Sequence, residues 1–345
     1  MKKTHSLTLF LLIVAALAWS GAYLSTPGRG SVATFTVVQG ESTDSIANRL
    51  KQDGFVRSLW LFKLALRQSG LAGKLQPGEY VLSGAQNYAE IIARLSAGGV
   101  AANEVVLKII EGWDLRDIQR ELERAGFADQ GNFLTATGDP LADDYRSDLR
   151  PAPDRSAEFP FLESKPKEVS LEGYLFPDTY RLFRDAGSPD AVRDLLANFQ
   201  RRLNQAGIFA LAAKSGRSLH EILTMASIVE KEVGTDEDRR LAADIFWRRL
   251  AQGMPLQADS TVNYVTGKSV PAASAADLAA KSRYNTYKFP GLPPGPICNP
   301  GLKAIEAVLK PTPNAYWYFL TDSEGKVYYA RTIDEHNRNK AKYLK

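Results

Sequence analysis

The longest hydrophobic stretch of the chain lies at its N-terminus. Two lysines precede an uncharged run, Ser6 to Ser25, that is rich in Leu, Ile, Val and Ala. At roughly 1.5 Å per residue, this run is just long enough for a helix to cross the core of a bilayer. The positive flank belongs on the cytoplasmic side, so the rest of the chain is expected outside the cytoplasm. We predict a cytoplasmic tail over residues 1–6, a transmembrane anchor over 7–25 and a linker over 26–34; a cleaved signal peptide is the alternative.

One pattern of apolar and polar residues occurs twice, 72 residues apart. Residues 37–55 and 109–127 each contain an extended apolar run, a glycine turn, a helix with Ile and Leu four residues apart, and a final Gly-Phe pair. The repeat predicts two small β-α units. Further helical segments and a strand follow the first copy, so residues 35–99 are predicted to form a βααβ module that resembles LysM, a glycan-binding fold. Residues 100–169 are predicted to hold the second unit and an irregular connector.

Helical periodicity and aromatic strands are combined in the C-terminal half. Helices are expected near residues 190–206, 219–233, 239–252, 302–309 and 333–344, and strands near 316–321 and 327–330. This mixture is typical of an α+β domain. We therefore assign the chain to the α+β class, with its largest domain over residues 170–345.

An acidic residue interrupts the apolar face of one of these helices. Ser218, with Glu221 three positions later, matches a capping box, which predicts that a helix begins there. At about 100° per residue, Glu230 falls within roughly 60° of the apolar face, whereas Glu221 and Glu232 fall on the opposite, solvated face. The apolar residues are Leu219, Leu223, Ala226 and Val233. A buried carboxylate costs stability unless it has a partner or a function, so Glu230 is our candidate catalytic acid.

The composition excludes several classes of protein. Of 345 residues, 44% are hydrophobic and 24% charged, as in globular proteins. The net charge of +4 is spread along the chain without a basic block, so we expect no nucleic-acid partner. A single cysteine, Cys298, permits no intrachain disulfide or CxxC zinc site, and we expect no metal or cofactor. The cations Lys231 and Arg239 are expected to be solvated.

Five segments of the C-terminal domain combine aromatic residues with Asn, Asp, Gln or Thr on loop-forming sequence. They are residues 171–180, 255–264, 282–287, 291–301 and 335–337. Sugars bind to this mixture, because aromatic faces stack on ring CH groups and short polar side chains bond the hydroxyls. The pattern therefore predicts a sugar-binding cleft around Glu230.

Four of the motifs also resemble those of a known family. Glu172-Gly-Tyr-Leu-Phe-Pro-Asp-Thr-Tyr180, Ala226-Ser-Ile-Val-Glu-Lys-Glu232, Tyr284-Asn-Thr-Tyr287 and Gly291-Leu-Pro-Pro-Gly-Pro-Ile297 are similar to those of the endolytic murein transglycosylases, also called YceG-like. The resemblance implies a YceG-like catalytic domain, with Glu230 as the catalytic residue. It also implies cleavage of nascent peptidoglycan strands at the MurNAc-β-1,4-GlcNAc bond, with 1,6-anhydro-MurNAc ends, which terminates strand elongation. The run Gln257–Thr261 departs from the family, which usually has Asp followed by Pro or another small residue.

The chemistry of Glu230 agrees with that resemblance. A hydrolase needs two carboxylates around the scissile bond. A lytic transglycosylase can work with one, which protonates the leaving oxygen and then takes a proton from the C6 hydroxyl of the substrate, the internal nucleophile. We expect the substrate to be held by Gln257, Asp259, Ser260, Thr261, Tyr284, Asn285 and Asn299.

Three other functions remain open from the sequence, and one of them is a transpeptidase accessory factor that acts through contacts alone and would give no anhydro products. A muramidase would hydrolyse the same bond with Asp259 as its second carboxylate. A peptidoglycan-binding scaffold would keep its function without Glu230. The expected partners are peptidoglycan strands and the inner membrane, and the family implies association with peptidoglycan synthases of the penicillin-binding type. The expected location is the inner membrane, with a single span and the bulk of the chain in the periplasm.

Overall fold

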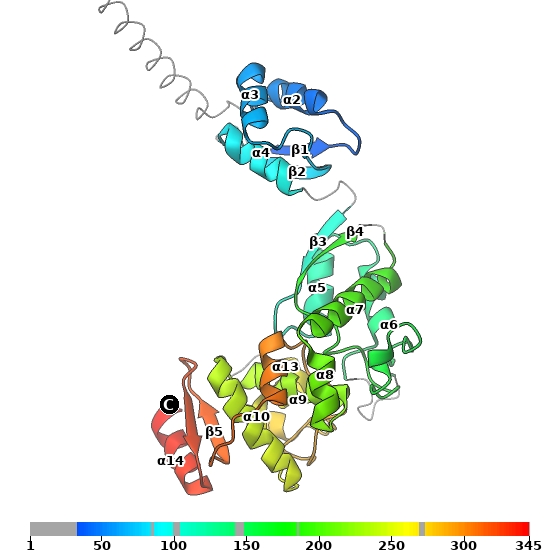
Figure 1. Cartoon of the computed structure of the whole chain (residues 1–345). Helices are drawn as coiled ribbons and strands as arrows, with labels where there is room; N and C mark the ends of the chain where they lie inside the picture. The colour runs from blue at the N-terminus through cyan, green and yellow to red at the C-terminus, as the bar shows by residue number, and fades with distance from the viewer. Residues whose placement is uncertain are drawn as a thin grey trace, which may run out of the picture. The chain divides into compact units, whose positions relative to one another are not determined.

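The protein is described here by a computed structural model, which covers residues 33–83, 86–98, 104–141, 148–184, 186–268 and 273–344. The chain divides into two compact units, Met1–Val105 and Val106–Lys345. Helices and two-stranded sheets occur in both described parts, which confirms the α+β class (Figure 1). The predicted tail, the anchor and most of the linker lie outside the described residues. Within the described ranges, the structure contains no helix with the length and apolar character of a membrane span.

The first unit is built on a pair of antiparallel strands. In this pair, β1 (Ala33–Val37) lies beside β2 (Gly78–Leu82), with Phe35 opposite Tyr80. The strands are separated in sequence by α2 (Thr43–Gln52) and α3 (Leu59–Gln68), and α4 (Tyr88–Ala97) follows. Serine side chains cap α2 and α3, and a capping box begins α4. Their apolar faces form one core with the strands, so the predicted element order is observed.

The second copy of the sequence repeat folds locally like the first. Here β3 (Glu104–Lys108) precedes α5 (Leu115–Ala125), as β1 precedes α2. The turn glycines of the two copies, Gly40 and Gly112, have φ values of 80° and 82°. Each helix is followed by a glycine with positive φ, where a side chain would add strain. The predicted repeat of strand, glycine turn and helix is therefore present in the structure.

Residues 106–169 belong to the same compact unit as the C-terminal domain, whereas the sequence suggested a separate small unit and connector. Strand β3 pairs with β4 (Thr179–Phe183). The same segment contains the 3₁₀ turn η1 (Gln130–Asn132), the short helix α6 (Phe133–Thr137) and the 3₁₀ turn η2 (Pro160–Leu162). Phe161 stacks within an aromatic cluster that includes Tyr174 and Phe199. The connector is thus anchored by aromatic packing, which its Pro- and Asp-rich composition did not predict.

Helices form the body of the second unit, with α9 at its centre. Helix α9 (Leu219–Glu232) is buried along most of its length and contacts α10 (Asp236–Ala251) and α13 (Leu302–Leu309). The remaining helices are α7 (Ser188–Gln205), α8 (Ile208–Ser215), α11 (Asp259–Thr266) and α12 (Ala275–Leu278). Central burial fixes α9 in place, so a side chain in its last turn has a defined position.

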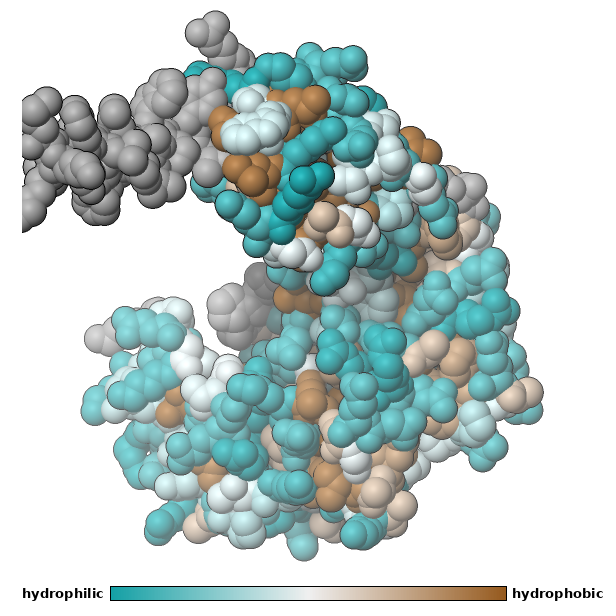
Figure 2. All heavy atoms as spheres, turned by 45° about the horizontal axis from the view of Figure 1, so that its top comes forward, coloured by the Kyte–Doolittle hydropathy of each residue, from teal (hydrophilic) through white to brown (hydrophobic). Residues whose placement is uncertain are grey.

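A hairpin and a helix complete the chain. Strands β5 (Tyr318–Thr321) and β6 (Val327–Ala330) are antiparallel, and α14 (Ile333–Tyr343) packs against them. Thr321 Oγ1 donates to the carbonyl of Glu232 at 3.0 Å, which ties the hairpin to the end of α9. On the face drawn in Figure 2, hydrophilic residues predominate and hydrophobic ones occur in small groups.

Candidate active site

Glu230 lies in the last turn of α9, and its side chain is 6% exposed. Its Oε1 accepts a hydrogen bond from Arg239 Nη2 of α10 at 2.8 Å. Its Oε2 accepts the backbone N–H of Gly301 at 3.0 Å. Gly301 is the N-cap of α13, so the positive end of that helix dipole faces the carboxylate. Glu230 is therefore buried, as predicted, but it is paired rather than isolated.

Arg239 is a buried partner and not the solvated cation that the sequence suggested. Its side chain is 10% exposed and also bonds Asp236 Oδ1 at 3.1 Å. Asp236 in turn pairs with Lys303 Nζ at 2.8 Å. This chain of charges joins α9, α10 and α13 around Glu230. The position of the carboxylate is thus set by three helices.

A second carboxyl group reaches the same place from the segment before α5. Gly112 donates its N–H to Asn299 O at 2.9 Å, and Asn299 donates its N–H to Trp113 O at 2.8 Å. These bonds place Glu111 against Gly301, where an added Cβ would lie 2.1 Å from Glu111 Oε1. Burial, and next the negative charge of Glu230, raise the pKa of Glu111. Sequence analysis missed Glu111, although it lies between the apolar strand and the turn glycine of the second repeat.

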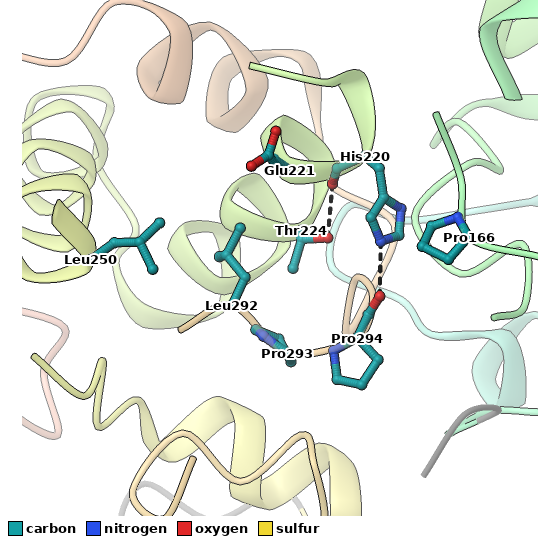
Figure 3. A pocket seen from close by; sticks show the side chains of 8 residues that line it. All are labelled: Pro166, His220, Glu221, Thr224, Leu250, Leu292, Pro293 and Pro294. Carbon is teal, nitrogen blue, oxygen red and sulfur yellow. Dashed lines mark hydrogen bonds between the residues drawn. The ribbon is translucent and has the colours of Figure 1, made fainter. Parts of the chain in front are cut away.

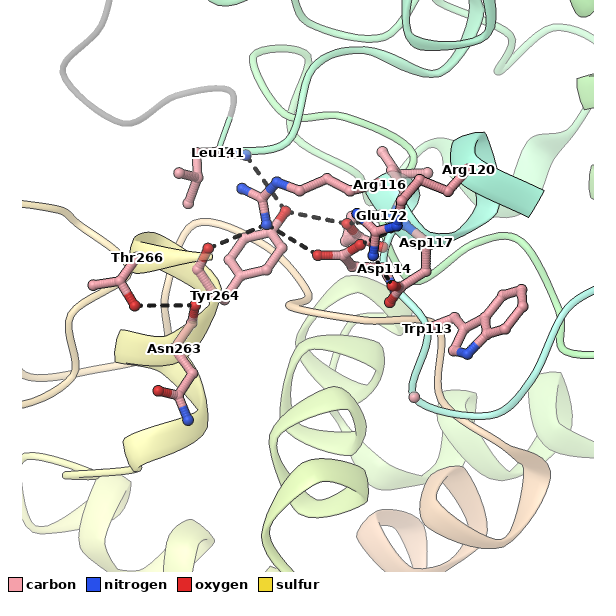
Figure 4. Close-up of polar contacts among 12 residues, drawn as sticks. Trp113, Asp114, Arg116, Asp117, Arg120, Leu141, Glu172, Asn263, Tyr264 and Thr266 are labelled. Carbon is pink, nitrogen blue, oxygen red and sulfur yellow. Dashed lines mark hydrogen bonds and ion pairs between the residues drawn. The ribbon is translucent and has the colours of Figure 1, made fainter. Parts of the chain in front are cut away.

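Glu172 is a third carboxyl group near this site, and it is fully buried. Its Oε2 accepts the N–H of Leu115 at 3.1 Å and the hydroxyl of Tyr264 at 3.1 Å, and the Tyr264 bond is drawn in Figure 4. Its Oε1 accepts from Asn299 Nδ2 at 3.1 Å. Burial raises the pKa of Glu172 well above its ordinary value. Glu172 links α5, α11 and Asn299, and Asn299 holds the backbone of the Glu111 segment. The carboxyl group therefore supports the site from within.

The run Asp259–Thr261 begins a helix, where the sequence suggested loop. Glu232 Oε1 accepts the N–H of Ser260 at 3.2 Å and its hydroxyl at 2.6 Å, which caps the start of α11. Glu232 is thus engaged with another helix rather than solvated, and burial raises its pKa. Asp259 Oδ1 accepts the Tyr287 hydroxyl at 2.8 Å. Asp259 is thus a neighbour of the Glu232 carboxyl, whereas Glu111 is the neighbour of Glu230.

Most other residues predicted to hold the sugar are buried. These are Thr261, Tyr284, Asn285 and Asn299. The Asn285 amide donates to Leu278 O at 3.1 Å and Ala280 O at 2.9 Å, and the Asn299 amide donates to Trp113 O at 3.0 Å. Gln257, by contrast, is exposed and has the left-handed φ of 53°. Burial gives the first group supporting positions, and leaves Gln257 and the half-buried Asp259 able to reach a ligand.

A hollow of about 440 Å³ lies at the opposite end of α9 (Figure 3). It is lined by Pro166, His220, Glu221, Thr224, Leu250, Leu292, Pro293 and Pro294. His220 Nε2 donates to Pro294 O at 2.8 Å, so Nδ1 accepts from the Tyr174 hydroxyl at 3.0 Å. Both ring nitrogens are occupied, and Glu230 lies ten residues further on, roughly 15 Å along the helix. The hollow is therefore separate from the carboxylate site.

Among the residues that the structure describes, no three His, Cys, Asp or Glu side chains are grouped to hold a metal ion. Cys298 is buried, its thiol contacts Ser227 O at 3.3 Å, and burial raises its pKa well above the ordinary value. A thiol with a raised pKa is a poor nucleophile. The reactive groups at this end of α9 are carboxyls.

Comparisons with known proteins agree with these motifs. The model of the YceG-like family matches residues 35–342. The chain is 33% identical to the endolytic murein transglycosylase of Bacillus subtilis, covering 97% of this chain and 91% of that protein. A protein of the same name from Streptococcus pneumoniae is 31% identical, and the match spans 90% of this chain but 58% of that longer protein. A crystal structure of a YceG-like protein from Listeria monocytogenes superposes with a TM-score of 0.60 at 30% identity, covering 89% of this chain and 98% of that one. The chain belongs to the YceG-like family.

Proposed function

We propose that the protein is an endolytic murein transglycosylase, a lyase that cuts peptidoglycan strands internally at the MurNAc-β-1,4-GlcNAc bond. Family membership and the printed names of the relatives support the reaction class. The observation that supports assigning the reaction to Glu230 is the position of its carboxylate, which bonds Arg239 and the Gly301 amide. The product ends are 1,6-anhydro-MurNAc, and cleavage terminates strand elongation.

The proposed reaction needs no water. The C1–O4 glycosidic bond breaks as the C6 hydroxyl oxygen of the same muramic acid bonds to C1. One proton leaves that hydroxyl and one proton joins the departing oxygen, so the proton count is balanced. Because the nucleophile is part of the bound sugar, its effective concentration is high without activation of a solvent molecule. Glu230 is proposed to exchange a proton with the reacting atoms.

We place the sugar on the exposed side of Glu230. Gln257 and Asp259 are the proposed contacts to its hydroxyl or N-acetyl groups, because both reach the surface. Ser260, Thr261, Tyr284, Asn285 and Asn299 are proposed to position this surface from below. A contact residue should change KM when it is altered, whereas a supporting residue should first change stability.

We further propose that residues 7–25 anchor the chain in the inner membrane, with the enzyme outside the cytoplasm beside peptidoglycan synthases. The uncharged sequence and its basic flank support the anchor. Membrane fractionation of the full chain and of a chain without residues 1–25 tests this. Retention of the shortened chain in the membrane would contradict the anchor.

The first unit is proposed to bind glycan in the manner of a LysM module. The order β1-α2-α3-β2 supports this, as does Trp60, which is 70% exposed at the start of α3. A solvated Trp can stack on a sugar ring. Sedimentation of the Glu230→Gln chain with insoluble peptidoglycan tests the proposal. Trp60→Ala should weaken binding and Val81→Ala, an exposed control, should not; equal binding would contradict it.

Two variants test the catalytic assignment. Glu230→Gln keeps the size of the side chain but cannot exchange a proton, so cleavage of glycan strands should fall by at least about 100-fold. Glu221→Gln alters an acid at the other end of α9 and should retain activity. A scaffold protein would show no cleavage by either chain. Equal cleavage by Glu230→Gln and the unaltered protein would remove Glu230 from the mechanism.

A further inference from the structure

Glu111 and Glu230 share one backbone element, Gly301. The Gly301 N–H bonds Glu230 Oε2 at 3.0 Å, and the open side of its Cα faces Glu111, whose Oε1 lies 2.1 Å from the position of an added Cβ. With ordinary bond lengths, these contacts put the two carboxyl groups no more than about 8 Å apart. That spacing can accommodate a glycosidic bond between them.

Hydrogen bonds fix the backbone that follows Glu111, whereas the residue itself is exposed to solvent. Gly112 and Trp113 exchange hydrogen bonds with Asn299, two residues before Gly301. Lys231, next to Glu230 on α9, donates to Gly112 O at 3.4 Å. An added Cβ on Gly112 would lie 3.8 Å from Glu230 Cγ. The segment therefore lies directly against the end of α9.

The two carboxyl groups have different surroundings. Glu230 receives a guanidinium and a backbone N–H, which are the partners of an ionised carboxylate. Around Glu111, burial and the charges of Glu230 and Asp236 raise the pKa, whereas Arg239 and Lys303 act in the opposite direction. Two neighbouring carboxyls in different settings are typical of an acid and base pair.

We propose that Glu111 is the acid partner of Glu230 in the reaction proposed above. The Glu111 carboxyl donates its proton to the departing glycosidic oxygen, and the Glu230 carboxylate takes the proton of the C6 hydroxyl as C6–O bonds to C1. After the step, Glu111 is ionised and Glu230 is protonated. Transfer of one proton from Glu230 to solvent and of one from solvent to Glu111 restores the starting state.

The test compares two leaving groups in the full chain. One substrate is the natural uncrosslinked glycan strand, and the other is a muramic acid-terminated oligosaccharide with a p-nitrophenyl group at its reducing end. A nitrophenolate departs without a proton, so loss of an acid affects it little, whereas loss of the base still prevents attack by the C6 hydroxyl. The variants are Glu111→Gln, Glu111→Asp, Glu230→Gln and the exposed control Glu123→Gln.

We expect Glu111→Gln to lower kcat on glycan strands by about 100-fold or more and to lower it on the aryl substrate by less than about 10-fold. It should also remove the alkaline limb of the pH profile on strands, and Glu111→Asp should restore part of the rate. Equal losses on both substrates, or activity like that of the control, would overturn the proposal. Unaltered protein that forms no anhydro ends would instead overturn the proposed function.

Discussion

The end of the Glu111 side chain occupies the space where a Cβ on Gly301 would lie. A Cβ added to Gly301 would lie 2.1 Å from Oε1 and 2.3 Å from Cδ of Glu111. The φ of Gly301 is −73°, which any residue adopts, so a side chain here would be opposed by the contact with Glu111 and not by backbone conformation. The same residue bonds Glu230, so the contact couples two carboxyl groups.

Gly301→Ala should therefore lower both stability and activity. The methyl group forces the flexible end of the exposed Glu111 side chain to move, so stability should fall by only about 1 kcal/mol or less, whereas displacement of the Glu111 carboxyl should lower kcat. Thermal unfolding and kcat measure the effect. Adding Glu111→Ala to Gly301→Ala should recover part of the stability. Gly234→Ala is the matched control, because an added Cβ there meets nothing within 4 Å. If the losses of stability from the two substitutions simply add in the double variant, the contact between Glu111 and a side chain at position 301 is contradicted.

Arg239→Gln should separate Glu230 from its charged partner. Because both side chains are largely buried, removal of one charge should cost about 2–4 kcal/mol in unfolding free energy. Glu230 keeps the Gly301 amide but loses its orientation, so kcat should fall by about 10-fold or more. Arg240→Gln, a change at the exposed neighbour on α10, should leave both quantities unchanged. Full activity in Arg239→Gln would show that the ion pair does not position Glu230.

Glu172 should make the stability depend on pH. Burial raises its folded-state pKa well above the ordinary value of 4.5, so the unfolded chain loses this proton at lower pH than the folded chain does. Its contribution to stability is complete below the unfolded value and is lost as the pH rises toward the folded value, by at most about 1.4 kcal/mol per pH unit.

Denaturant unfolding of the protein and of Glu172→Gln between about pH 4 and pH 8 measures this contribution. The difference in unfolding free energy should shrink as the pH rises, while Glu111 and Glu232 affect both chains alike. A difference that stays constant over this range would contradict the raised pKa.

Ser260→Ala should distinguish support from substrate contact. Its hydroxyl bonds Glu232 at the start of α11, so its loss should cost about 1 kcal/mol, as for other helix caps. KM for glycan strands should change by less than about twofold if Ser260 acts only through the helix. Gln257→Ala, at an exposed position, should raise KM with little change in stability. The reverse assignment of the two effects would contradict our division of these residues into substrate contacts and supports.

The sequence predicted the elements whose signals are local. Helical periodicity and the paired turn glycines predicted the βααβ order of the first unit and the repeat, and one capping box predicted the helix that carries Glu230. Helix α11 was not predicted, because its N-terminus is capped by Glu232, a residue distant in sequence. Ala258, its N-cap, gives no local signal.

The candidate site was predicted only in part for the same reason. The position of Glu230 among apolar residues follows from the period of one helix. The ion pair with Arg239 depends on how α10 packs against α9, and the approach of Glu111 depends on hydrogen bonds to Asn299. Asn299 itself was expected to touch sugar because it lies in a polar loop, yet its amide is used inside the protein. Residue types showed which polar groups could bind sugar, but only the tertiary structure distinguishes residues that can contact the substrate from residues that position the site.

Mass spectrometry of uncrosslinked glycan strands digested by the full chain tests the transglycosylase assignment most directly. Intramolecular attack by the C6 hydroxyl should give products about 18 Da lighter than the products of hydrolysis, and Glu230→Gln should give neither. Products that contain added water would contradict the account, and would make Glu111 and Glu230 the two carboxylates of a muramidase.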